Sequence, residues 1–157
     1  MIGNIAHRGH ALRIAVGIMM LVLLLAGEAW AATITVDDSG GAMYTRIQDA
    51  IDNATAGDTI MVYSGTYYEN VNVTKQLTLK GVNTGSGKPV VNTSAWGPTI
   101  LLSADNITLD GFALFNSMGD MILVKSDQNN IINNTMISGS QFGIYVNNSN
   151  QNNITNK

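Results

Sequence analysis

Acidic side chains are the residues of this chain whose type and spacing could perform hydrolysis. Glycoside hydrolysis needs two carboxylates on one face, one as acid and the other as base or nucleophile. One sequence repeat beyond Asp110 stands Asn134, and one repeat beyond Asp127 stands Asn150. We therefore expect the acids to give way to amides instead of stacking in pairs, and we predict no catalytic residue. The aspartates after position 100 are Asp105, Asp110, Asp120 and Asp127.

A polysaccharide lyase would need different chemistry, with a Lys or Arg base beside a calcium-binding group of carboxylates. Lys125 is the only basic residue between Lys88 and Lys157. It lies between Asp120 and Asp127, and we interpret this segment as a solvated bend.

Methionines offer a second chemistry, because thioethers suit Cu(I). Met118 and Met121 form an M-x-x-M motif, but Met121 also begins an apolar run and fits core packing better. The chain has no cysteine, and its two histidines, His7 and His10, stand in the N-terminal segment. We expect no metal and no cofactor.

Aromatic residues near predicted turns suggest carbohydrate contact. Tyr67, Tyr68 and Trp96 combine a flat ring with a polar tip, which suits the face of a sugar. The alternative is that the tyrosines pack against the helix or the first coil. The expected partner is a polysaccharide or a cell-envelope glycan.

Seven Asn-x-Ser/Thr sequences could accept an N-linked glycan. In a chain with 18 asparagines many such sequences arise by chance. Asn72 and Asn92 are the better candidates, because Asn106 and Asn153 are expected inside a structural ladder. The full set is Asn53, Asn72, Asn92, Asn106, Asn133, Asn147 and Asn153.

The N-terminus has the pattern of a secretory signal. A basic start is followed by the apolar run Ile14–Ala26 and by the small-x-small sequence Ala29-Trp30-Ala31. We predict a signal peptide over residues 1–31, cleaved between Ala31 and Ala32, and one domain over 32–157. An uncleaved membrane anchor is the alternative. After cleavage no membrane contact is expected, and the location is secreted, cell-surface or periplasmic.

One helix and many short strands must position these groups. Apolar residues at Ile47, Ala50, Ile51 and Ala54 predict an amphipathic helix over 44–54, with Thr45 as a candidate cap. From residue 59 onward, apolar runs of two to four residues end at Gly, Asn, Ser or Asp. Short strands at even spacing predict all-β structure.

An internal repeat narrows the fold further. Ser126–Ile131 recurs as Ser149–Ile154 at an offset of 23 residues, and Asp105–Ile107 aligns with Asn129–Ile131 at 24. Leu77 to Ile107 is a looser offset of 30, with 84–89 as an inserted loop. Three short strands per repeat predict a parallel β-helix of about four coils, each about 23 residues long.

Stacked coils bring equivalent residues about 4.8 Å apart. This stacking predicts an internal ladder of Ile107, Ile131 and Ile154. It also predicts an asparagine ladder of Asn106, Asn130 and Asn153 at a bend, where Asn tolerates the left-handed conformation.

The opening of the domain resembles right-handed parallel β-helix proteins. The segments that carry the resemblance are 44–51, 56–62, 65–71 and 77–81, and the later Asn/Ile repeats are similar to those of NosD-like and archaeal cell-surface members. The resemblance implies a pectate-lyase-like superhelix with an N-terminal helical cap. Such families include sugar lyases, hydrolases and esterases, copper-site maturation factors and surface-layer proteins.

Composition completes the sequence-based interpretation. A net charge of −3 over 157 residues gives no electrostatic footprint for nucleic acid. We expect a non-catalytic scaffold or glycan-binding surface, truncated at its C-terminus and continued by further coils of a longer parent chain. The competing hypotheses are a polysaccharide-active enzyme whose catalytic coils lie outside this chain, and a NosD-like copper-site maturation factor.

Overall fold

The structure is a computed structural model, and it describes residues 30–93, 95–116, 118–138 and 142–155. The chain divides into two units, Met1–Trp30 and Ala31–Lys157. The predicted signal segment before Trp30 lies outside the described residues.

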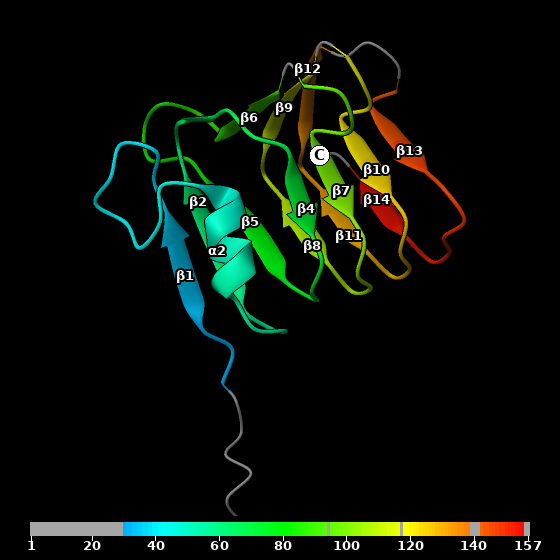
Figure 1. Cartoon of the computed structure of the whole chain (residues 1–157), viewed down its shortest axis with the longest axis horizontal. Coiled ribbons are helices and arrows are strands. Elements are labelled where there is room, and N and C mark those ends of the chain that lie inside the picture. Colours follow the sequence, from blue (N-terminus) through cyan, green and yellow to red (C-terminus); the bar gives the residue numbers. More distant parts are fainter. Residues whose placement is uncertain (1–29, 94, 117, 139–141, 156–157) are drawn as a thin grey trace, which may run out of the picture. The chain divides into compact units, whose positions relative to one another are not determined.

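The second unit is a parallel β-solenoid built from three sheets (Figure 1). Sheet A has six strands, which are β1 (Thr33–Val36), β2 (Thr59–Tyr63), β5 (Thr78–Val82), β8 (Thr108–Asp110), β11 (Asn130–Ile132) and β14 (Asn153–Thr155). Sheet B has four strands, which are β3 (Thr66–Tyr67), β6 (Val90–Thr93), β9 (Ala113–Asn116) and β12 (Thr135–Ser138). Sheet C has the remaining four, which are β4 (Val71–Val73), β7 (Ile100–Leu102), β10 (Ile122–Val124) and β13 (Ile144–Val146).

Successive turns visit the sheets in the order A, B, C, and the paired strands are parallel. The solenoid has about 5 turns, which roughly matches the predicted number of coils. The prediction counted coils after Gly57 only, whereas β1 already pairs with β2 in sheet A. The all-β parallel fold predicted from the repeat is therefore confirmed.

The core is a set of aliphatic columns that run along the solenoid. In sheet A, one inward column follows the strand pairing and contains Ile34, Ile60, Leu79, Leu109, Ile131 and Ile154. The predicted offsets of 23 and 30 residues are confirmed by the pairs Asn130–Asn153 and Thr78–Thr108. The predicted offset of 24 is wrong, because Thr108 pairs with Asn130, 22 residues on.

This two-residue error changes the predicted ladders. Ile131 stacks on Leu109 and not on Ile107, and Asn130 stacks on Thr108 and not on Asn106. The rung between Asn153 and Asn130 is confirmed, since Asn153 Nδ2 donates to Asn130 Oδ1 at 2.8 Å. The left-handed position of the bend belongs instead to Asn106, Gln128 and Gln151, with φ of 58°, 59° and 57°.

A buried asparagine column stands beside that bend. Asn129 is 1% exposed and takes the place that Ile107 occupies one turn earlier. Its Oδ1 accepts the N–H of Ile107 at 2.9 Å, and its Nδ2 donates to Asn152 Oδ1 at 3.0 Å. Each amide therefore satisfies backbone and side-chain groups of neighbouring turns, which explains part of the asparagine surplus without a ligand.

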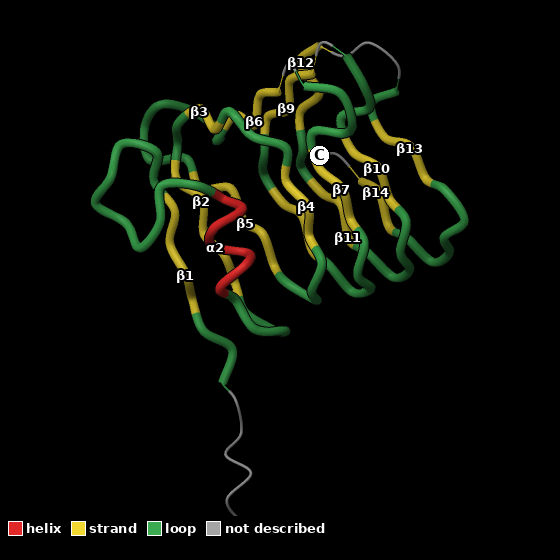
Figure 2. The backbone as a smooth tube through the Cα atoms, viewed as in Figure 1, coloured by secondary structure: helices red, strands yellow, loops and turns green. Residues whose placement is uncertain are grey.

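The single helix of the described residues, α2 (Ile47–Asn53), is shorter than predicted (Figure 2). Its N-cap residue is Arg46, without a side-chain capping bond, so Thr45 does not cap it. The cap comes from Glu69, whose two carboxylate oxygens accept the N–H groups of Ile47 and Gln48 at 2.8 and 3.0 Å. The helix contacts β1, β2 and β4 and buries its apolar face at the first turn.

Candidate functional site

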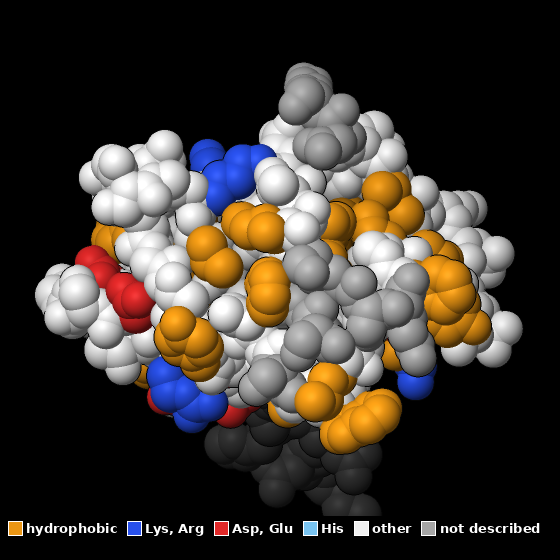
Figure 3. Space-filling model, turned by 90° about the horizontal axis from the view of Figure 1, so that it is seen from above, with side chains coloured by type: hydrophobic (Ala, Val, Ile, Leu, Met, Phe, Trp, Pro, Cys, Tyr) orange, Lys and Arg blue, Asp and Glu red, His pale blue; other side chains and the backbone are white. Residues whose placement is uncertain are grey.

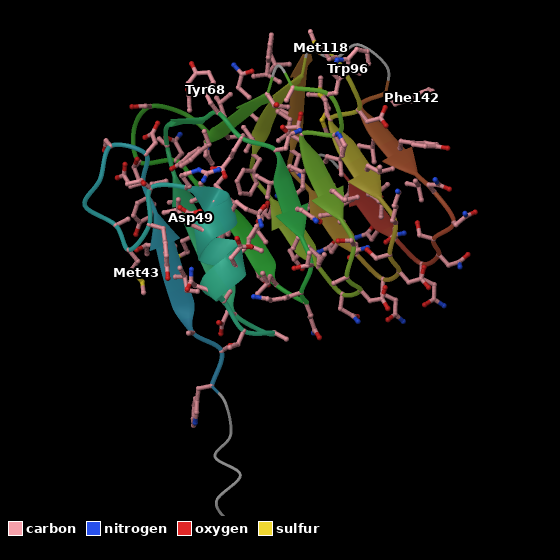
Figure 4. All side chains as sticks on the ribbon, viewed as in Figure 1. Met43, Asp49, Tyr68, Trp96, Met118 and Phe142 are labelled. Atoms are coloured by element: carbon pink, nitrogen blue, oxygen red, sulfur yellow. The ribbon has the colours of Figure 1, made fainter. Side chains whose placement is uncertain are left out.

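Four exposed apolar side chains mark the same bend on successive turns of the solenoid. Each stands between a strand of sheet B and the following strand of sheet C. We call this set the apolar strip, and its members with their exposed fractions are Tyr68 (79%), Trp96 (83%), Met118 (44%) and Phe142 (57%). They lie along the upper edge of the molecule in Figure 4. Because neighbouring turns are about 4.8 Å apart, the strip extends for roughly 15 Å.

Figure 3 looks down on this edge and shows hydrophobic side chains gathered over it. At one end of the strip the ring of Phe142 stacks on that of Tyr145, with centroids 5.6 Å apart and planes inclined by 29°. Scattered single apolar residues are normal on a surface, but a row repeated on four successive turns is a distinctive feature.

Two shallow hollows of about 200 Å³ each lie beside Tyr68 and Trp96 and share Asn70. Asn70 is held firmly, since its Nδ2 donates to the carbonyl of Pro98 at 2.7 Å and its Oδ1 accepts the hydroxyl of Thr93 at 2.9 Å. Aromatic walls around a fixed amide are an arrangement that suits a sugar ring and its hydroxyl groups.

Tyr67 does not belong to this site, which corrects the prediction for that residue. It is 3% exposed, and its hydroxyl donates to the carbonyl of Tyr63 at 2.9 Å. Burial raises the pKa of Tyr67 to about 12. The alternative, that a tyrosine packs in the first coil, holds for Tyr67, whereas Tyr68 and Trp96 remain predicted contacts.

The two preferred glycan acceptors occupy different settings. Asn72 is exposed on β4, and its Oδ1 accepts the hydroxyl of Ser103 at 2.9 Å. Asn92 is half-buried on β6 and lines one of the two hollows. In contrast, the Nδ2 atoms of Asn53 and Asn133 donate to Asp49 O and Asp110 Oδ1. Nδ2 is the atom that would carry a glycan, so both residues stay secondary candidates.

The acidic residues are arranged differently from the prediction. Asp105 and Asp127 occupy the same position on neighbouring turns, 22 residues apart, so two acids do stack. Asp105 Oδ1 accepts the N–H of Asp127 at 2.8 Å, and Asp127 Oδ1 accepts the N–H of Asn150 at 2.7 Å. Both carboxylates thus support the bend. Asp110 is followed by Ile132, not by Asn134.

The two methionines of the M-x-x-M motif diverge. Met118 is exposed in the apolar strip, whereas Met121 is 3% exposed and belongs to the core. Within the described residues, no group of three or more His, Asp or Glu side chains is placed to hold a metal ion.

Sequence reasoning missed Phe142 and assigned Met118 only to copper. A usable signal was present, because each strip residue follows a sheet B strand by a few residues in its own repeat. These bends differ in length and were not part of the repeat alignment, so the recurrence of an apolar residue at each bend was not recognised.

The fold is that of a parallel β-solenoid repeat protein, and the apolar strip lies along one of its edges. A curated protein named "Cell surface glycoprotein", from Methanothermus fervidus, is 32% identical to this chain over 132 residues. The match covers 80% of this chain and 21% of that protein, so the chain spans about a fifth of its relative's length. No protein-family model and no solved structure matches the chain. In the described part of the chain, no helix has the length and hydropathy needed to span a bilayer.

Proposed function

We propose that this chain is a segment of a cell-surface β-solenoid whose apolar strip binds a polysaccharide or an envelope glycan. The observation that carries the proposal is the row of Tyr68, Trp96, Met118 and Phe142, one on each of four turns. A row of exposed apolar groups, three of them flat aromatic rings, suits a ligand that is itself a repeating chain. The name of the relative and the predicted signal peptide support a location outside the cell.

Affinity electrophoresis tests the proposal. The chain is run in native gels that contain soluble neutral or acidic polysaccharides, and retardation by at least one of them is expected. Tyr68→Ala with Trp96→Ala should abolish the retardation and leave the melting temperature unchanged, because both side chains are more than three-quarters exposed. Met43→Ala is the matched control, since Met43 is 63% exposed and lies outside the strip. Equal mobility of the double variant and the parent would refute the proposal.

Polysaccharide cleavage is the second candidate, and the stacked pair of Asp105 and Asp127 favours it. The bonds of both carboxylates to backbone N–H groups support a structural role instead. If the unsubstituted chain released reducing ends from a polysaccharide and Asp127→Asn did not, catalysis would be favoured over a structural role for these carboxylates. A pectate-lyase-like activity would appear in the same cleavage assay. A NosD-like role in copper-site maturation would require a tight copper site, and we expect a copper titration to find none.

A further inference from the structure

Asp58 is a buried carboxylate between α2 and β2, with an exposed fraction of 4%. Its Oδ2 accepts the N–H and the hydroxyl of Thr55 at 2.8 and 2.9 Å. Its Oδ1 accepts the backbone N–H of Ala32 at 2.7 Å. The N–H groups of Thr55 and Ala32 hold the pKa of Asp58 below its usual range, so the group is ionised at neutral pH.

No Lys or Arg of the described residues forms an ion pair with this carboxylate. Lys75 is the cation whose charge acts on Asp58, but its Nζ donates elsewhere, to the carbonyls of Ile51, Asp52 and Ala54 at 2.9, 2.9 and 2.8 Å. Three hydrogen-bond donors stabilise this carboxylate, and a positive charge in contact with it would stabilise it further. The site therefore favours a positive group on the side of Ala32.

Ala32 is fixed from two directions. Its N–H points to Asp58, and its carbonyl accepts the N–H of Thr59 at 2.8 Å, one residue before β1 pairs with β2. Ala31 and Ala32 are both exposed, and the peptide bond between them is the bond that the small-x-small pattern marks for signal peptidase.

We propose that hydrolysis of the Ala31–Ala32 bond creates an α-ammonium group at Ala32, which Asp58 captures as a partly buried ion pair. Water adds across the peptide bond, so Ala31 leaves with a carboxylate and Ala32 keeps the nitrogen as an ammonium. The neutral N–H donor at 2.7 Å becomes a charged one without any movement of the chain. Processing thus anchors the first strand of sheet A.

This inference rests on the predicted secretory signal and not on glycan binding, so either can fail alone. The bond between Asp58 and the N–H of Ala32 already has a charged acceptor, and an ammonium donor adds the attraction of a full positive charge to it. For a domain of this size we expect the correctly processed protein to melt about 4 °C higher than one in which Ala32 carries a neutral amide.

The test uses the full chain, expressed with its own N-terminus and purified after export. Mass spectrometry and N-terminal sequencing should identify Ala32 as the first residue. A second version carries one glycine inserted between Ala31 and Ala32, so that cleavage after Ala31 leaves the nitrogen of Ala32 in a neutral peptide bond. The parent should melt about 4 °C higher than this insertion variant.

Asp58→Asn should abolish the difference between the two versions, whereas Asp49→Asn, which removes a half-exposed carboxylate of α2, should preserve it. If Asp58→Asn does not fold, the parent and insertion proteins still decide the question. Export with any other first residue, or equal melting of the parent and insertion proteins, overturns the proposal. Failure of glycan binding leaves it standing.

Discussion

Tyr67 and Tyr68 show how two adjacent residues of one type receive different roles. Tyr67 is the last residue of β3 and enters the core, whereas Tyr68 is the first residue of the following bend and faces the solvent. The identity of the residue indicates neither direction, and only the folded chain shows which of the two tyrosines is buried.

Tyr67 should make the solenoid sensitive to alkali. Its pKa is raised to about 12 by burial, against about 10 in an unfolded chain. The neutral phenol therefore stabilises the fold below pH 10, and this contribution is lost as pH rises toward 12. In Tyr67→Phe the alkaline unfolding midpoint should move upward, although the free energy of unfolding at pH 7 should fall by about 1 kcal/mol. Circular dichroism against pH measures both, and an unchanged midpoint would contradict the prediction.

Glu69 caps α2 from 22 residues away, and its removal should destabilise the first turn. Glu69→Ala leaves two backbone N–H groups without an acceptor and should lower the free energy of unfolding by about 2 kcal/mol. Urea denaturation measures the loss. Asp52→Ala is the control, because its side chain meets only the exposed amide of Gln48, at 2.8 Å, and should cost less than about 0.5 kcal/mol.

At the scale of the element, the buried asparagine column beside the bend decides the register between strands. A slip of two residues keeps every side chain on its own face, so the inside-outside pattern cannot distinguish an offset of 22 from one of 24. The structure selects 22, since Asn129 then replaces Ile107 in the buried column and binds its N–H.

Asn129→Leu tests that column. The substitution keeps the branched shape of the side chain, with somewhat larger methyl groups, but leaves the N–H of Ile107 without its acceptor. It also removes one of the two side-chain amides, Asn129 and Asn152, that donate to the carbonyl of Ser126. We expect a loss of about 2–4 kcal/mol in the free energy of unfolding. Asn153→Ala, on an exposed rung, should cost less than about 1 kcal/mol. Similar losses for the two variants would argue against a supporting role for Asn129.

Gly81 and Gly111 allow the backbones of two successive turns to approach closely. A Cβ on Gly81 of β5 would collide with the backbone carbonyl of Gly111, one turn on. The glycine of the Leu77-x-Leu79-x-Gly81 segment is therefore a steric requirement of the stack.

For the whole molecule, the two ends of the solenoid differ. At the first turn α2 contacts β1, β2 and β4, whereas at the last described turn a hollow of about 380 Å³ opens between Ile131, Ile144 and Ile154. Ile154 is 43% exposed, although its column is buried at Ile131. An open strand edge beside apolar side chains is a template for pairing with another chain.

We therefore predict that the isolated chain self-associates through β14. Ile154→Lys should increase the monomer fraction in light scattering, because a charged edge residue opposes strand pairing. Met43→Lys, at an exposed position far from that end in Figure 4, should leave the association unchanged. An unsubstituted chain that is monomeric at high concentration would contradict the prediction.

The pattern of residues along the chain was sufficient for the fold class, the helix, the inserted loop and two of the three repeat offsets. Those features depend on local periodicity, and the same pattern of apolar and polar residues recurs in each repeat. The Glu69 cap, the Asp105–Asp127 stack, the burial of Tyr67 and the four-residue apolar strip required the folded chain. Each joins residues about one or more turns apart, and bends of unequal length between the strands decide which of them meet.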